Sequence, residues 1–224
     1  MNDITATLLA QHLINLPFLT QTTGLVQELS LKVPNGTKTA KVKKIPAARV
    51  EYRKPVSGGG SFNGSFNLSF NTGGGVVTNV CPHNGTYYDF IPKTAETGIL
   101  YFEDGGSKLI KSDTRKAEYT GTLTLVCWLN MKLIGDNYKI GDFINAVAAQ
   151  IPLHLAQSNF VIGGSVVVDQ VLPNRPSPFN KYDYDEAEKQ YITYPFDYFA
   201  MKLNTKIIIN RLCTTSIVLD PLQC

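Results

Sequence analysis

Apolar and polar residues alternate with a period of two along the middle of the chain. From Leu123 to Leu133 every second residue is apolar, and threonine, asparagine or lysine occupies most of the positions between. This alternation predicts a half-buried strand over residues 119–134. Residues 140–157 then place apolar side chains at helical spacing, and residues 160–172 are rich in valine and isoleucine. We therefore expect a β-α-β scaffold around which the rest of the chain is arranged.

A similar alternation predicts a closing strand over residues 194–211. Phe199, Met201, Leu203, Ile207 and Ile209 share one parity, and Lys202, Asn204 and Lys206 share the other. The remaining expected elements are short, and Gly-Gly pairs or Pro and Asn-Gly mark their ends. They are an amphipathic helix at 3–16, strands at 25–33, 37–52, 86–91, 98–102 and 108–110, a hairpin turn at 103–106, a polar linker at 113–118, and a bulge or close approach at Gly163-Gly164.

This order of elements predicts an α+β fold. An antiparallel sheet would pack against the N-terminal helix and the central helix, with an inserted β-arm. The length of 224 residues suits one domain spanning 1–224, and 43% hydrophobic with 17% charged residues is typical of a folded protein. We expect residues 212–224, which include three consecutive apolar residues, to dock on the body or on a neighbouring subunit.

The strand at 37–52 and the residues after it are strongly cationic. Their seven positive charges face the single acid Glu51. One interpretation is a solvated edge strand whose lysines block sheet-to-sheet association. The other is a surface that faces an acidic neighbour or the phosphates of a DNA passage. The cations are Lys38, Lys41, Lys43, Lys44, Arg49, Arg53 and Lys54.

Residues 57–75 form a short strand pattern between two glycine triplets. Phe62, Phe66 and Phe70 share one parity, with serine and asparagine between them. Glycine on both sides of a strand predicts a hinged, projecting arm, and its aromatic face needs cover from the parent domain or a neighbour. The glycine runs lack the lysine and the helix start of a phosphate-binding loop.

Residues 173–193 predict a long acidic loop that starts with three prolines. Loops of this length within a domain are often functional. The loop is complementary in sign to the basic strand, so we hypothesise a contact between the loop of one subunit and the strand of the next. Its acidic residues are Asp183, Asp185, Glu186 and Glu188.

The sequence offers no recognisable catalytic or metal-binding motif. The four cysteines and three histidines have no metal-ligand spacing, and no nucleophile motif or nucleotide-binding glycine pattern is present. We therefore expect a non-enzyme without cofactor or metal. The N-terminus has no basic region before an apolar run, and no apolar stretch is long enough for a membrane span, so we expect a soluble cytosolic product.

Two other classes of function stay open. Exposed tyrosine and phenylalanine side chains would suit a non-catalytic binding module for carbohydrate or a receptor. A carboxylate-based hydrolase would need Glu103 or Asp104 in a cleft with Asp183 or Asp185. The Glu103-Asp104-Gly105-Gly106 sequence is also what a hairpin turn requires.

The element order resembles that of the tail-terminator and head-to-tail connector proteins of tailed bacteriophages. The resemblance covers residues 3–16, 119–172 and 194–211, whereas the arm at 57–75 and the strands at 86–110 depart from it and leave the ring type open. It implies a structural virion protein, assembled in the host cytoplasm, that forms a hexameric or dodecameric ring around the DNA channel. Neighbouring neck, portal or tail-tube proteins would be its partners, with non-specific contact to DNA and no membrane.

Overall fold

The computed structural model describes residues 2–35, 38–54, 78–80, 87–135, 137–151, 161–173, 181–182 and 194–211. The arm at 57–75, the acidic residues at 183–188 and the tail at 212–224 lie outside these ranges. The interpretations of those three segments therefore stay predictions.

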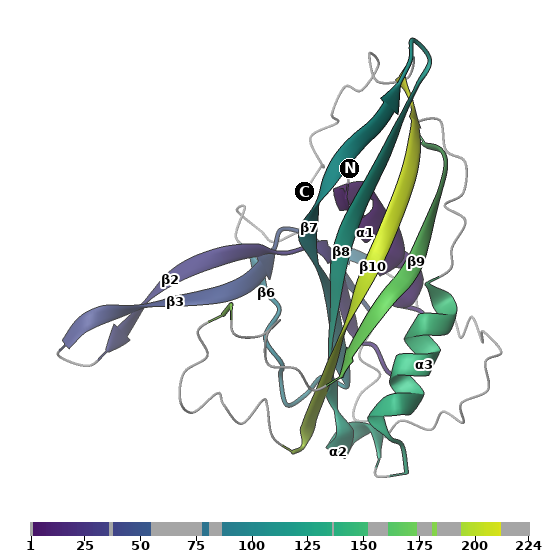
Figure 1. Cartoon of the computed structure of the whole chain (residues 1–224). Coiled ribbons are helices and arrows are strands. Elements are labelled where there is room, and N and C mark those ends of the chain that lie inside the picture. Colours follow the sequence, from purple (N-terminus) through teal and green to yellow (C-terminus); the bar gives the residue numbers. More distant parts are fainter. Residues whose placement is uncertain are drawn as a thin grey trace.

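The described residues form a large mixed sheet with helices on one face, which confirms the predicted α+β class (Figure 1). The helices are α1 (Asn2–Leu13), α2 (Met131–Ile134) and α3 (Ile140–Gln150). Neighbouring strands are antiparallel except β1 and β7, which run parallel. In order across the sheet the strands are β5 (Thr78–Val80), β4 (Glu51–Arg53), β1 (Gln21–Leu25), β7 (Gly98–Ser112), β8 (Lys116–Asn130), β10 (Phe196–Asn210) and β9 (Val161–Pro173).

The main core lies between this sheet and helices α1 and α3. The alternating residues predicted to point inward from β8 and β10 are buried here, from Leu123 to Leu129 and from Phe199 to Ile209. Helix α3 contributes Phe143, whose ring meets that of Phe18 edge to face at 4.9 Å. Strands β8 and β9 both pair with β10 from opposite sides, so α3 belongs to a crossover that passes over β10.

A second, smaller core covers part of the opposite face of the sheet. Trp128, Tyr101 and Tyr198 point to this side and are almost fully buried. Ala48 and Phe90 cover them from a three-stranded sheet and the segment that follows it. That sheet contains β2 (Gln27–Asn35), β3 (Lys38–Ala48) and β6 (Tyr88–Asp89), in the order β2-β3-β6.

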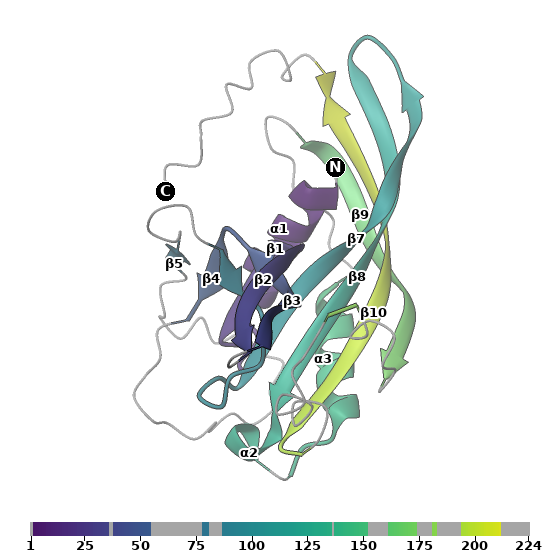
Figure 2. The same ribbon diagram turned by 90° about the vertical axis from the view of Figure 1, so that its left-hand side faces the viewer.

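The hairpin of β2 and β3 projects from the body of the molecule (Figure 1). Figure 2 views the molecule with this hairpin pointing towards the reader. Strand β6 pairs with β3 only at Ala47 and Ala48, which form the base of the hairpin. The rest of the hairpin is a two-stranded ribbon in the described part of the chain.

The first scaffold strand ends earlier than predicted, and so does the N-terminal helix. The strand expected over 119–134 ends at Asn130, where its pairing with β10 stops opposite Phe196. The residue before Phe196, Pro195, accepts a bond from the Met131 amide at 2.8 Å but has no N–H with which to continue the ladder. The residues after Asn130 instead close a helical turn in which Gly135 donates to the carbonyl of Met131 at 2.8 Å. The helix expected over 140–157 is described only as far as Gln150, and α1 ends at Leu13.

The hairpin turn predicted at residues 103–106 is also wrong. Strand β7 continues through this segment, and the register shifts between Asp104 and Ser107, so the Gly-Gly pair forms a bulge. Gly106 adopts a φ of 95°, which glycine tolerates without strain. The true turn falls in the predicted linker, where the Asp113 carboxylate accepts bonds from the amides of Arg115 and Lys116. The register shift beside Gly163 confirms the other predicted bulge.

The chain also contains a strand that the sequence pattern did not predict. Strand β1, Gln21–Leu25, inserts between β4 and β7 and makes the sheet mixed instead of antiparallel. Its residues Gln21, Thr22 and Thr23 are buried although they are polar. The single strand expected over 37–52 is divided into β3 and β4, which belong to different sheets.

Candidate functional site

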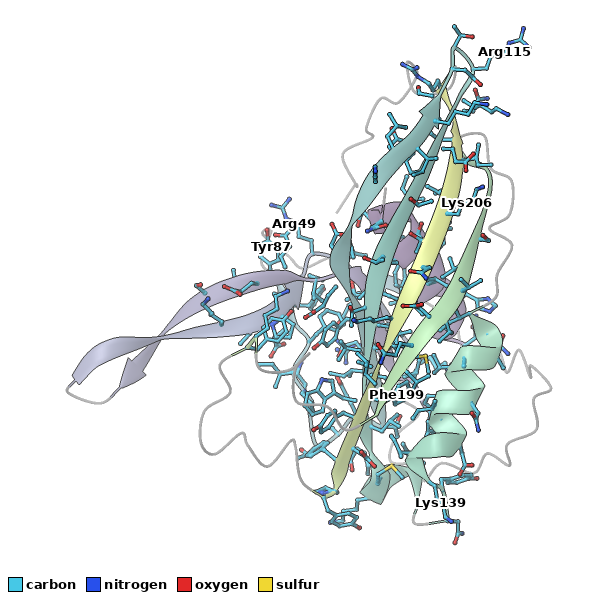
Figure 3. The ribbon with its side chains drawn as sticks, viewed as in Figure 1. Arg49, Tyr87, Arg115, Lys139, Phe199 and Lys206 are labelled. Atoms are coloured by element: carbon cyan, nitrogen blue, oxygen red, sulfur yellow. The ribbon has the colours of Figure 1, made fainter. Side chains whose placement is uncertain are left out.

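The structure separates the predicted basic strand into residues with different partners. Lys44 pairs with Glu28 at 2.9 Å on the projecting hairpin. The Arg49 guanidinium lies 5.3 Å from the centre of the Tyr87 ring, and its Nε donates to the Tyr87 hydroxyl at 3.1 Å (Figure 3). Both contacts lie at the surface, where such pairs stabilise a fold only weakly.

Arg53 and Lys54 are bound inside the fold. Arg53 lies between two buried carboxylates, with Nε 3.0 Å from Glu51 and Nη1 3.2 Å from Glu96. The Lys54 ammonium donates to the carbonyl of Leu16 at 2.6 Å. These two cations therefore hold β4 against its surroundings.

Burial lowers the pKa of Lys54 to about 8, from its ordinary value of 10.5. Between these two pH values the unfolded chain holds the proton and the folded chain does not, so folding becomes more favourable as pH rises. We expect the free energy of unfolding of the natural protein to increase across this window relative to that of Lys54→Met. Urea unfolding of both proteins at several pH values checks this, because the other titrating groups cancel in the difference. Parallel pH curves would contradict it.

Most of the other predicted site residues lie outside the part of the chain whose side chains the structure describes. The structure describes the backbone of Lys38, Lys41 and Lys43 in β3 but not their side chains. Seven further residues lie wholly outside the described ranges: Phe62, Phe66, Phe70, Asp183, Asp185, Glu186 and Glu188. A contact between the acidic loop and the basic strand stays a prediction.

The neighbouring carboxylates Glu103 and Asp104 are engaged in separate structural contacts. Glu103 accepts a bond from the Tyr182 hydroxyl at 2.7 Å, and Asp104 accepts bonds from the Asn2 amide and the backbone of Gly106. The two acids are successive residues of one strand and so point to opposite faces. This arrangement gives no support to the hydrolase interpretation.

A polar surface emerges where strands β7, β8, β10 and β9 lie side by side above the second core. We name it the polar face. It surrounds a shallow hollow of about 680 Å³ and includes Lys108, Thr120, Thr122, Ser165, Asn204 and Lys206. In the strand register Thr120 stands opposite Lys108 on one side and Lys206 on the other, and Thr122 stands opposite Asn204.

The polar face and its surroundings are cationic. Lys202 stands opposite Thr124 in the next row of the same surface, and Lys111 continues it towards the hairpin tip. Lys206 pairs with Glu118 at 2.6 Å, whereas no ion pair joins Lys108, Lys111 or Lys202 to another described residue. The pKa of Glu118 is lowered, chiefly by its bond from Lys206.

Residues behind the sheet hold the polar face in place. The Asn2 amide of α1 donates to the carbonyls of Thr122 and Gly106, at 3.0 Å each, and to Asp104. Gly121 makes this approach possible, because a side chain there would collide with Asn2 and lie 2.9 Å from the Gly106 carbonyl oxygen. The Thr205 hydroxyl of β10 also donates to the Asn2 side-chain oxygen at 3.3 Å, so the start of α1 is tied to β7, β8 and β10 beneath the polar face.

The polar positions of each strand can be predicted from the sequence, but the pairing that joins these strands into one surface cannot. The polar parity of the closing strand and the threonines of the strand before it are visible as separate patterns. Only the pairing of β8 with β10 shows that they form one surface. Lys108 could not be placed, because the predicted turn at 103–106 put it in a different strand.

Neither metal-ligand clusters nor membrane-spanning helices are found in the described part of the chain. Its His, Cys, Asp and Glu side chains form no group of three that could hold a metal ion. No helix among these residues is long and apolar enough to cross a membrane. Burial raises the pKa of the Cys127 thiol, which lies in the main core.

Neither a scan against protein-family models nor a search of the curated proteins finds a match for this chain.

Proposed function

We propose that this chain is a structural subunit of an oligomeric ring at the neck or tail end of a tailed bacteriophage. The ring surrounds the DNA channel, contains six or twelve copies, and contacts neighbouring neck, portal or tail-tube proteins in the virion. The chain has no enzymatic activity in this proposal, and it assembles in the host cytoplasm.

The projecting hairpin of β2 and β3 is the observation that carries the proposal. A two-stranded ribbon is at best marginally stable in water, and here its third strand reaches only Ala47 and Ala48. The sequence places apolar residues at alternate positions of β2, namely Leu29, Leu31 and Val33. A ribbon of this kind gains stability when a neighbouring subunit covers it, and a closed ring gives every copy the same cover.

The tip of the second hairpin, between β7 and β8, supports the same conclusion. Figure 1 shows this tip extending beyond the helices. Leu109 and Ile110 lie near it and are 47% and 53% exposed. Apolar side chains exposed on an extended hairpin are suited to contact with another protein.

The particle size in solution tests the proposal. We expect light scattering after gel filtration to give about six or twelve times the chain mass of 24.7 kDa. Negative-stain images should show rings with a central opening. A monomer at micromolar concentration, or an open filament, would contradict the proposal.

A shortened hairpin provides the matched variant. Leu29 stands opposite Ile45 in the strand register, so an Asn-Gly turn that joins them closes a shorter hairpin of the same type. We expect this variant to be a folded monomer, because its body keeps both cores. A thermal melt separates loss of assembly from loss of folding, and rings formed by the folded variant would show that the hairpin is not the contact.

A further inference from the structure

We propose that the polar face, with Lys111 and Lys202 beside it, binds the phosphate backbone of duplex DNA without reading its sequence. The inference deepens the proposed function and rests on it, because the ring is what brings a duplex to this surface. It places the DNA contact on the large sheet, on residues other than the basic strand at 38–54.

The lysines are spaced so that they can reach different phosphates of a duplex. Lys108 and Lys206 lie two strands apart, which corresponds to about 10 Å between their backbones. Lys202 and Lys206 lie four residues apart on one strand, or about 13 Å. Each DNA strand carries a phosphate about every 3.4 Å along the helix axis, so lysines at these separations reach different phosphates. Two acids share this surface. Glu118 pairs with Lys206 and stands opposite Lys111, and Glu103 stands opposite Thr124 in the row of Lys202. The four lysines outnumber these two acids, so the surface stays cationic.

Hydrogen-bonding side chains lie between the lysines. Thr120, Thr122 and Ser165 provide hydroxyl groups, and Asn204 provides an amide. Hydroxyl and amide donors next to lysine are the groups with which proteins hold phosphate oxygens and set the register of a duplex. A surface four strands wide is too broad to enter a groove as a helix or a two-stranded ribbon does, so it contacts the backbone and not the bases.

Among the residues that the structure describes, those that line the hollow include no aromatic side chain. Its lining residues are glycine, serine, threonine, lysine, asparagine and Val167. Single-stranded nucleic acids are held by stacking of bases on aromatic side chains. Sugar-binding surfaces use aromatic side chains in a similar way. The lining therefore favours a duplex over a single strand or a glycan.

An acidic segment from a second copy is the competing occupant of this surface. Its charge would suit the lysines, but carboxylates on a protein segment do not require the hydroxyl groups that β8 and β9 place between them. Measurements of DNA binding and of particle mass separate the two occupants, because one requires DNA and the other requires only the ring.

The test is the salt dependence of binding to a labelled duplex of about 30 base pairs, measured by fluorescence anisotropy. The variant carries Lys108→Gln, Lys202→Gln and Lys206→Gln. The control carries Lys93→Gln, Lys132→Gln and Lys139→Gln, which remove the same charge elsewhere. Figure 3 shows Lys139 at the far end of the molecule from Lys206. A single-stranded oligonucleotide of equal length is the second probe.

We expect the slope of log K against log salt to fall by about 0.9 for each phosphate that the protein no longer neutralises, or about 2.7 for the face variant. The control variant should bind like the natural protein, and the duplex should bind more tightly than the single strand. Equal binding by the face variant and the control, or tighter binding to the single strand, would overturn the inference.

The mass of each variant, measured on the same samples, separates this inference from the proposed function. A face variant that keeps its ring and loses DNA binding supports both. A face variant that loses its ring shows that the face meets a second copy, which overturns the inference. If the natural protein is a monomer that still binds the duplex through these lysines, the ring proposal fails and the inference stands.

Discussion

Replacing Arg53 by methionine lowers the free energy of unfolding by about 3–5 kcal/mol at neutral pH, because it leaves two buried carboxylates without their cation. The side chains of Glu51 and Glu96 are 3% and 8% exposed, and Arg53 lies within 3.2 Å of both. Removal of one partner of a buried ion pair costs far more than the pair itself contributes. Urea unfolding followed by circular dichroism measures the loss.

The loss should shrink as the pH falls. Burial already raises the pKa of Glu96 above its ordinary value of 4.5, and Arg53 opposes this rise. Without Arg53 the folded variant takes up protons at a higher pH than its unfolded chain does. Its stability relative to the natural protein therefore improves as the pH falls from neutrality towards 4.5. A pH-independent difference would show that lost packing, and not charge, is the cause.

Arg49→Met is the matched control for this substitution. It removes the same side chain from the neighbouring part of the chain, but Arg49 is exposed and stacks on Tyr87 at the surface. Its loss should cost about 1 kcal/mol or less. A loss as large as that of Arg53→Met would contradict the assignment of the buried site to Arg53.

The strands that alternate strongly could be predicted from sequence because one face of each is buried. The inward residues of β8 and β10 follow a period of two over most of each strand, and the structure confirms their burial. Strand β1 could not be predicted in this way. Its buried positions are polar, and Thr22, for example, donates to the Ala10 carbonyl of α1 instead of packing as an apolar residue.

The predicted hairpin turn is wrong because a hairpin turn and a β-bulge favour the same residues. The Gly105-Gly106 pair suits a hairpin turn and a bulge equally well, and the choice depends on pairing with β8. Asp113 carried the real turn signal, because its carboxylate caps two backbone amides. That signal is a single residue, whereas two successive glycines are conspicuous in a sequence.

The candidate site was beyond sequence reasoning for a related reason. A cluster of charges in sequence, such as the one at 38–54, is divided when β3 and β4 enter different sheets. The lysines of the polar face come from β7 and β10, about a hundred residues apart in the chain. Long-range strand pairing brings them together, and nothing local in the sequence records that pairing.

The sheet surface that includes the polar face is covered by the second core at one end and open at the other. Trp128 and Thr122 have the same parity on β8, but Trp128 is 1% exposed under the second core, with the Tyr198 ring 5.1 Å away. We expect Trp128→Ala to lower the free energy of unfolding by about 3–5 kcal/mol, since it opens a large cavity. Urea unfolding measures this loss.

Thr122→Ala is the matched control, because Thr122 is exposed on the polar face of the same strand. It should change the free energy of unfolding by no more than about 0.5 kcal/mol. Two equal losses would mean that the upper surface is also covered, which would remove the polar face as a site for DNA. A large loss at Trp128 with none at Thr122 means that the fold uses one end of this surface for its own stability. The other end, with its lysines and hydroxyl groups, is then available to a partner.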